Sequence, residues 1–205
     1  MDTPTATSLQ LIRDGVLTWQ AFSPHHKVEL TSSAIVLNGH LYVFDPIPLS
    51  EELMPALESH GRPKAVIATN ENHLRSSETL ARRWSIPIVA SDAARFGGVP
   101  VVPLHLGESA FDSFEIIELD GGAAGELAFF ARDTRVLIVG DALFNLPGYG
   151  FDILPGRYCT NRARLISRLR ELAKLDFDLL LMAHGQPVDH DPAGRIKELL
   201  ERVAA

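Results

Sequence analysis

Residues 33–46 read SAIVLNGHLYVFDP. Two runs of apolar residues, rich in β-branched and aromatic types, flank the pair Asn38-Gly39. An Asn-Gly pair favours the positive φ angles of a two-residue type I′ turn, whose twist matches that of the strands it joins. The stretch therefore predicts a β-hairpin from Ser33 to Asp45, around which the other elements can be placed.

Apolar strands and amphipathic helices follow this hairpin along the chain. The segments that predict further strands are residues 15–22, 64–69, 86–91, 99–104, 114–119, 126–131, 135–140 and 178–183. Helices are expected after Ser50, from Ser76 or Ser77 to Trp84, after Thr160 or Asn161, and from Pro192. Continuous apolar strands need burial on both faces. The order therefore predicts an α/β fold of two sheets covered by helices on their outer faces, in a single domain over residues 1–205.

Composition narrows the class of protein and its partners. The chain has 205 residues, with 19 Lys+Arg and 26 Asp+Glu, so its formal net charge at pH 7 is −7. This charge disfavours nucleic acid and acidic membrane surfaces as partners. A single cysteine, Cys159, excludes an intrachain disulfide framework and suits a reducing compartment. We find no signal-peptide pattern and no apolar stretch long enough to span a membrane, so we expect a soluble, cytoplasmic protein.

Four apolar strands run directly into loops of polar or glycine residues. These loops begin at Asn70, at Gly121-Gly122, at Asp141 and at His184-Gly185. In α/β architectures, binding and catalytic groups gather beyond the carboxyl ends of strands, where a rigid sheet positions them. We therefore expect the four loops to share one cleft.

These loops and their neighbours occur in an order that resembles the metallo-β-lactamase superfamily. The elements that carry the resemblance are Phe44-Asp45-Pro46, Thr69 with the polar cluster after it, the GxxxGE turn at residues 121–126, the VGDALF stretch at residues 139–144, and Ala183-His184-Gly185. The resemblance extends from about residue 15 to the C-terminus. It implies a four-layer αββα sandwich with a metal site on one edge, hydrolase chemistry and, as in many members, a homodimer.

The metal motif of this family is largely replaced. The family's THxHxDH motif corresponds to residues 69–75, which read TNENHLR. Five positions that ligate metal in the family carry other residue types here, in order Asn70, Asn72, Leu74, Arg75 and Gly122. The resemblance leaves Asp141 as the bridging aspartate and His184 as the final histidine.

Ligand chemistry argues against the family's dinuclear centre. A catalytic zinc takes about three protein ligands plus water, and neutral amide oxygens are poor ligands for it. An arginine stays cationic and repels a divalent ion. We therefore expect no resident cofactor. Since an uncompensated Asp141 carboxylate is unfavourable in a cleft, we predict an ion pair between Arg75 and Asp141, completed by Asn70, Asn72 and His184.

Three interpretations of this region stay open from the sequence. In the first, a metal-free cleft binds a small polar or anionic molecule through Asn70, Asn72, His73, Arg75, Asp141 and His184. In the second, the two asparagines satisfy backbone groups in the turn, and Arg75 is an ordinary surface charge. In the third, His73, Asp141 and His184 hold one zinc, iron or manganese ion that activates water against an ester or thioester. Whether the protein is an enzyme is therefore open.

Overall fold

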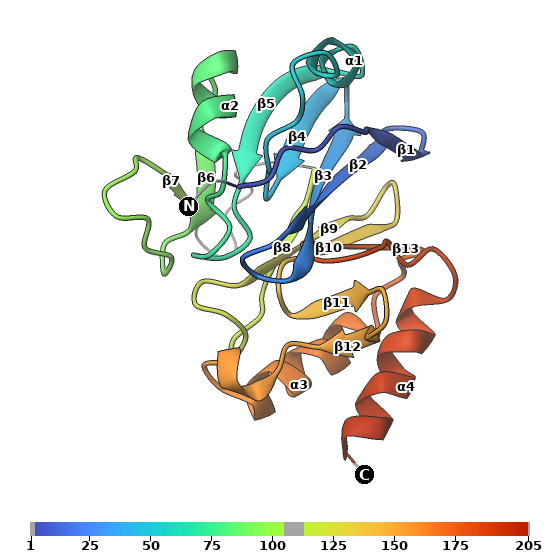
Figure 1. Ribbon diagram of the computed structural model, residues 1–205. Coiled ribbons are helices and arrows are strands. Elements are labelled where there is room, and N and C mark those ends of the chain that lie inside the picture. The colour runs from blue at the N-terminus through green and yellow to red at the C-terminus, as the bar shows by residue number, and fades with distance from the viewer. Residues whose placement is uncertain (1–2, 105–112, 205) are drawn as a thin grey trace.

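The computed structural model describes residues 3–104 and 113–204 (Figure 1). Its first sheet has the strand order β1-β2-β3-β4-β5-β6-β7. The strands are β1 (Gln10–Arg13), β2 (Val16–Ser23), β3 (Val28–Leu37), β4 (His40–Phe44), β5 (Arg62–Ile67), β6 (Ile88–Ser91) and β7 (Val102–Leu104). Strands β1 to β4 pair antiparallel, whereas β4 to β7 pair parallel.

The predicted hairpin is confirmed. Strands β3 and β4 pair antiparallel with Leu37 opposite His40. Asn38 and Gly39 between them have φ angles of 51° and 75°, as a type I′ turn requires.

The second sheet has the order β13-β10-β9-β8. Its strands are β8 (Glu115–Glu118), β9 (Leu127–Ala131), β10 (Val136–Val139) and β13 (Leu179–Met182). Strand β10 is parallel to β13 and antiparallel to β9. A separate hairpin of β11 (Leu143–Leu146) and β12 (Gly150–Ile153) was not predicted, because its strands are short and mix polar with apolar residues.

In the part of the chain that the structure describes, the helices are α1 (Met54–Glu58), α2 (Ser77–Trp84), α3 (Arg162–Leu172) and α4 (Pro192–Ala204), with a 3₁₀ turn η1 (Gly156–Tyr158). Asn161 caps α3, since its side chain accepts a hydrogen bond from the Arg164 backbone N–H. Helix α1 starts at Met54 rather than after Ser50, because Pro55 has no N–H and fits only in the first turn of a helix. Each helix of the described ranges is too short or too polar to cross a bilayer.

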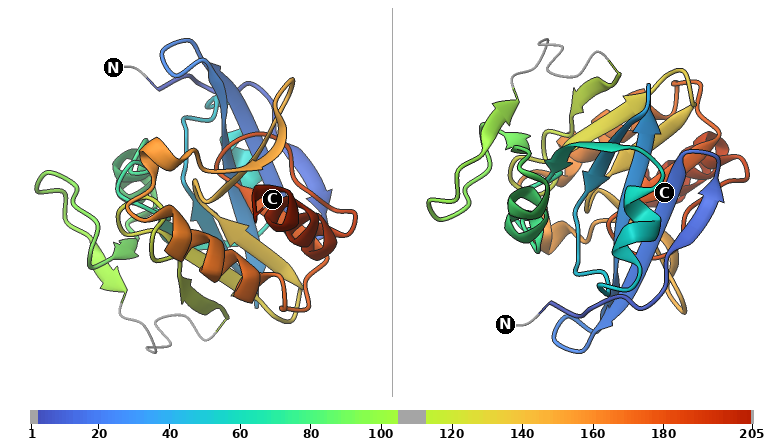
Figure 2. Two further views of the ribbon diagram at one scale, coloured as in Figure 1. Left: turned by 90° about the horizontal axis from the view of Figure 1, so that it is seen from below. Right: turned by 90° about the horizontal axis from the view of Figure 1, so that it is seen from above.

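Three hydrophobic clusters separate four layers, which confirms the αββα sandwich (Figures 1 and 2). The middle cluster joins the sheets; in it the rings of Phe44 and Phe129 pack edge to face, 5.2 Å apart. A second cluster buries Leu57 and Leu80 of α1 and α2 against the first sheet. The third buries residues of α3 and α4 against the second sheet, among them Leu165. The two sheets therefore share one apolar interface, and the polar loops lie at its edge.

Candidate functional site

Strands of both sheets deliver polar residues to one edge of the sandwich. Asp45 follows β4 and Thr69 follows β5, which are parallel neighbours. Asp141 follows β10 and His184 follows β13, which are parallel neighbours in the other sheet. The backbone N–H of Leu127 donates to the Thr69 carbonyl at 2.8 Å and links the sheets at this edge. The carboxyl ends of β4, β5, β10 and β13 therefore lie at the same edge of the sandwich.

Two histidines converge on one oxygen of Asp141. Nε2 of His73 lies 3.2 Å from Asp141 Oδ1, and Nε2 of His184 lies 3.1 Å from the same oxygen. The ligand atoms of these three residues all lie within 4.8 Å of one another. The His73 side chain is 3% exposed, against 14% for Asp141 and 18% for His184, so the group is open to solvent on the side of the last two.

The other nitrogen of each imidazole is held by an acceptor. Nδ1 of His73 lies 3.0 Å from Asp45 Oδ2, and Nδ1 of His184 lies 3.1 Å from the carbonyl oxygen of Glu29. An acceptor at Nδ1 places the hydrogen of a neutral imidazole there, so its Nε2 carries a lone pair. Both lone pairs then face a carboxylate oxygen. This arrangement is repulsive unless protons or a metal ion stand between the three groups.

The electrostatics show how a proton on His73 fills this role on one side of Asp141 without a metal. Burial disfavours the imidazolium form of His73, but the carboxylates of Asp141 and Asp45 outweigh burial and raise its pKa from 6.5 to about 9. Burial would raise the pKa of Asp141, but the imidazoles of His73 and His184 hold it well below 3.8. His73 is therefore cationic and Asp141 anionic at neutral pH in the metal-free protein.

Asn70 and Glu126 hold Asp141 from its other side. Nδ2 of Asn70 donates to Glu126 Oε2 at 2.7 Å and to Asp141 Oδ2 at 3.1 Å. Oε1 of Glu126 accepts the backbone N–H of Ala142 at 3.1 Å. Glu126 is 2% exposed, and burial together with the nearby Asp141 raises its pKa from 4.5 to about 8.

Gly140 allows these side chains to approach the strand end. A Cβ atom at this position would lie 2.2 Å from Thr69 Oγ1, 2.8 Å from Glu126 Oε1 and 3.0 Å from Asn70 Nδ2. The first two contacts are shorter than real Cβ atoms show, so a side chain here would force Thr69 and Glu126 to move. A glycine directly before Asp141 is thus a condition for this packing.

The predicted ion pair between Arg75 and Asp141 is wrong. Within the described residues, the guanidinium has no carboxylate partner in direct contact. Its Nη1 donates to the carbonyl oxygens of Thr31 and Asp45, both at 2.9 Å, and its Nη2 donates to the carbonyl oxygen of Ala183 at 3.3 Å. The physical reason is that one carbonyl within β3 and the carbonyls of the residues just after β4 and β13 point at the guanidinium and occupy its donors. His73 and His184 take the place beside Asp141.

The remaining predicted positions have turn or packing roles. Asn72 is exposed, and its backbone N–H donates to Asn70 Oδ1 at 2.8 Å, which closes a side-chain turn. Gly121 packs against α3, since a Cβ atom there would lie 2.1 Å from the Asn161 carbonyl oxygen. The structure therefore brings Asn70, His73, Asp141 and His184 together, and it leaves Asn72 outside this group.

Asp45 and Glu126 belong to the site, but from the sequence they are named only as parts of the elements that carry the family resemblance, not as site residues. Asp45 follows an apolar strand directly, which is the same signal that drew attention to Asp141. Glu126 precedes β9, and because β9 is antiparallel to β10, the start of β9 lies beside the end of β10. The rule that functional residues follow strands misses a residue placed in this way.

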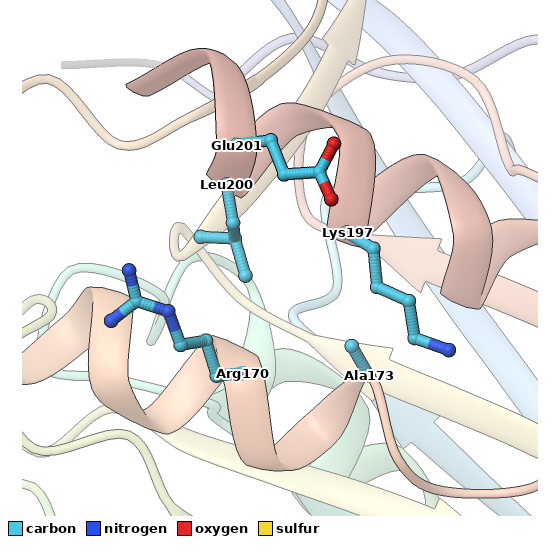
Figure 3. Close-up of a pocket in the computed structure, with 5 residues that line it drawn as sticks. All are labelled: Arg170, Ala173, Lys197, Leu200 and Glu201. Carbon is cyan, nitrogen blue, oxygen red and sulfur yellow. The ribbon is translucent and has the colours of Figure 1, made fainter. Parts of the chain in front are cut away.

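A pocket also occurs away from this edge, between α3 and α4 on the outer face of the second sheet (Figure 3). The residues that line it are Arg170, Ala173, Lys197, Leu200 and Glu201. It shares no residue with the group around Asp141.

The chain belongs to the metallo-beta-lactamase superfamily, whose family model matches residues 8–203. The fold is similar to that of DIM-1 metallo-beta-lactamase exposed to ceftazidime, with 12% identity, a TM-score of 0.74, and coverage of 99% of this chain and 100% of that chain. For VMB-1 at pH 5.5 the identity is 13% and the TM-score 0.75, with coverage of 98% and 99%.

A metallo-beta-lactamase from Erythrobacter litoralis is 11% identical, with a TM-score of 0.74 and coverage of 95% of this chain and 96% of that chain. No curated protein matches the sequence. At these identities the solved structures establish the shared fold, and any function must be argued from the residues of the site.

Proposed function

We propose that this protein is a hydrolase-like member of the superfamily that holds one divalent metal ion between His73, Asp141 and His184. The observation that carries the proposal is the convergence of two Nε2 atoms on Asp141 Oδ1. Their Nδ1 atoms lie within hydrogen-bond distance of the Asp45 carboxylate and of the Glu29 carbonyl, which are acceptors for an Nδ1 hydrogen. A cation between the two lone pairs and the carboxylate turns a repulsive arrangement into a binding site.

The donor set fits a divalent transition metal. Two imidazoles and one carboxylate hold zinc in several hydrolases and iron in many non-haem sites, with open positions left for other ligands. Metal-binding histidines almost always donate their second N–H to a carboxylate or a backbone carbonyl. His73 and His184 have one partner of each kind, Asp45 and Glu29. Zinc, iron and manganese are therefore the ions to test.

The residues of the chain orient and expose this centre. When bound, the ion supplies Lewis acidity and lowers the pKa of a coordinated water. Asp45 and the Glu29 carbonyl fix the two imidazole planes, while the part-exposed edges of Asp141 and His184 give a small substrate one direction of approach. We assign an ester or thioester as the substrate class, because one Lewis-acidic ion suffices for hydrolysis at such a carbonyl.

A metal-free ligand-binding cleft is the second candidate, and one observation favours it. The His73 imidazolium contacts the carboxylates of Asp45 and Asp141, and the Arg75 guanidinium interacts with both electrostatically, so the group contains its own compensating charge. In this alternative the cluster is a proton-bridged network that recognises a small polar molecule. Its weakness is that all three hydrogen bonds of the Arg75 guanidinium go to backbone carbonyls rather than to open space.

Metal stoichiometry after loading separates the two candidates. The purified, tag-free protein is incubated with zinc, iron(II) or manganese(II), desalted, and measured by elemental analysis. We expect one equivalent per chain, its loss in His73→Ala, and no change in His60→Ala, a control at an exposed histidine. Hydrolysis of a nitrophenyl ester and a simple thioester should follow the metal content. Wild-type protein without metal at any loading would refute the metal site and support the proton-bridged network.

A further inference from the structure

Asn70 and Glu126 form hydrogen bonds to both residues of the segment Asp141-Ala142. Asn70 Nδ2 bridges Glu126 Oε2 and Asp141 Oδ2, with distances of 2.7 and 3.1 Å. On the other side, Glu126 Oε1 accepts the backbone N–H of Ala142 at 3.1 Å. Glu126 therefore holds this segment at two points: directly at the backbone N–H of Ala142, and through Asn70 at the carboxylate of Asp141.

The consequence is the orientation of the Asp141 carboxylate. One oxygen, Oδ2, is tied to Asn70, so the other oxygen, Oδ1, faces the Nε2 atoms of His73 and His184. A rotation that carried Oδ1 away from the imidazoles would break the hydrogen bond from Asn70. Because Asn70 is 0% exposed and Glu126 2% exposed, water does not readily replace this bond.

Each of the three candidate ligands thus has its own outer partner. His73 has Asp45, and His184 has the Glu29 carbonyl. We propose that Glu126, acting through Asn70, is the positioning residue for Asp141. The part of this inference that concerns metal affinity rests on the proposed function. The part that concerns the orientation of the Asp141 carboxylate is independent of it.

Nuclear magnetic resonance of the metal-free protein tests the orientation alone. The ¹⁵N shifts of the His73 and His184 imidazoles report the group that faces each Nε2. The spectra are compared at a pH above the Glu126 pKa of about 8, where the carboxylate of the wild-type protein accepts both hydrogen bonds. In Glu126→Gln, one of these two accepted hydrogen bonds is replaced by an N–H that faces a donor, so we expect both imidazoles to shift. Glu118→Gln, at an exposed position of β8, is the matched control and should shift neither. A Glu126→Gln protein with lower thermal stability but wild-type imidazole signals would overturn the proposal.

Asn70→Ala keeps the proposal testable if Glu126→Gln does not fold. It removes the donor to Asp141 and leaves the contact between Glu126 and Ala142. We expect the same imidazole shifts, and unchanged signals in this variant would also count against the proposal.

Zinc affinity then tests the link to the metal site. Competition with a chromophoric chelator should show zinc binding weakened about 10- to 100-fold in Glu126→Gln and Asn70→Ala, and unchanged in Glu118→Gln. The ligand-field bands of the cobalt(II)-loaded protein should move in the first two variants. If wild-type protein binds no zinc, the proposed function fails, while the imidazole shifts still decide whether Glu126 positions Asp141. If zinc binds equally to all variants, the positioning role is refuted and the metal site stands.

Discussion

Replacement of Arg75 by methionine should strongly destabilise the protein, because Arg75 fastens the two sheets together at the site edge. Its guanidinium donates to the carbonyl oxygens of Thr31 and Asp45 in the first sheet, and to that of Ala183 after the last strand of the second. A hydrogen bond from a charged donor contributes about 1.5–3 kcal/mol to the free energy of unfolding. Because solvent screens a partly buried side chain such as Arg75, we take about 1 kcal/mol for each bond. Three such bonds give a loss of about 3 kcal/mol in the free energy of unfolding.

Urea unfolding of the metal-free protein, followed by circular dichroism, measures this loss. For a chain of this length, about 3 kcal/mol corresponds to a fall in Tm of about 6–12 °C. Arg82→Met is the control, since the Arg82 side chain is 72% exposed and, among the described residues, forms its ion pair with Glu78 on its own helix. It should cost less than about 0.5 kcal/mol.

Arg75→Lys separates charge from geometry. Lysine keeps the positive charge but lacks the planar fork that reaches several carbonyls, so it should recover only a minor part of the loss. Full recovery by lysine, or a methionine variant as stable as Arg82→Met, would refute the idea that three carbonyls hold the guanidinium.

Two further predictions follow from the packing and the titration of the site. Gly140→Ala should lower the free energy of unfolding by about 1–3 kcal/mol in the same urea titration, because its Cβ atom would lie 2.2 Å from Thr69 Oγ1. Gly156→Ala is the control and should be nearly neutral, because the nearest atom to its Cβ would lie 3.4 Å away. With chelator present, the free energy of unfolding should fall as the pH rises from 5 to 9. The folded-state pKa values of His73 and Glu126 are about 9 and about 8, above those in the unfolded chain. Both groups therefore hold protons more tightly in the folded state, and this stabilisation is lost as they deprotonate. Unfolding curves at three pH values that show constant or rising stability over this range would contradict the prediction.

Much of the fold is predictable because local signals and burial agree. The Asn38-Gly39 turn fixes the register of its hairpin without help from the rest of the chain, and Asn161 marks the start of α3 through its own side chain. The start of α1 was misplaced because Ser50 and the glutamates after it resemble a helix start, while Pro55 determines where the helix begins. The hairpin of β11 and β12 has too little apolar pattern to be recognised.

The site is less predictable because its contacts join distant segments. Asp141 and His184 follow apolar strands, and this local signal is sufficient to find them. Glu126 bonds Asn70 across 56 positions of sequence, and no spacing rule connects the two. The partners of Arg75 are backbone carbonyls, whose direction no side-chain pattern reveals. The single domain, the homodimer and the cytoplasmic location stay predictions.

The most direct test of the central claim is an anomalous difference map at the zinc edge, from a crystal of the zinc-loaded protein. Our account predicts one peak per chain, bounded by Nε2 of His73, Nε2 of His184 and Oδ1 of Asp141. Two peaks, a peak at another place, or no peak from protein soaked in excess zinc would contradict a single-ion centre.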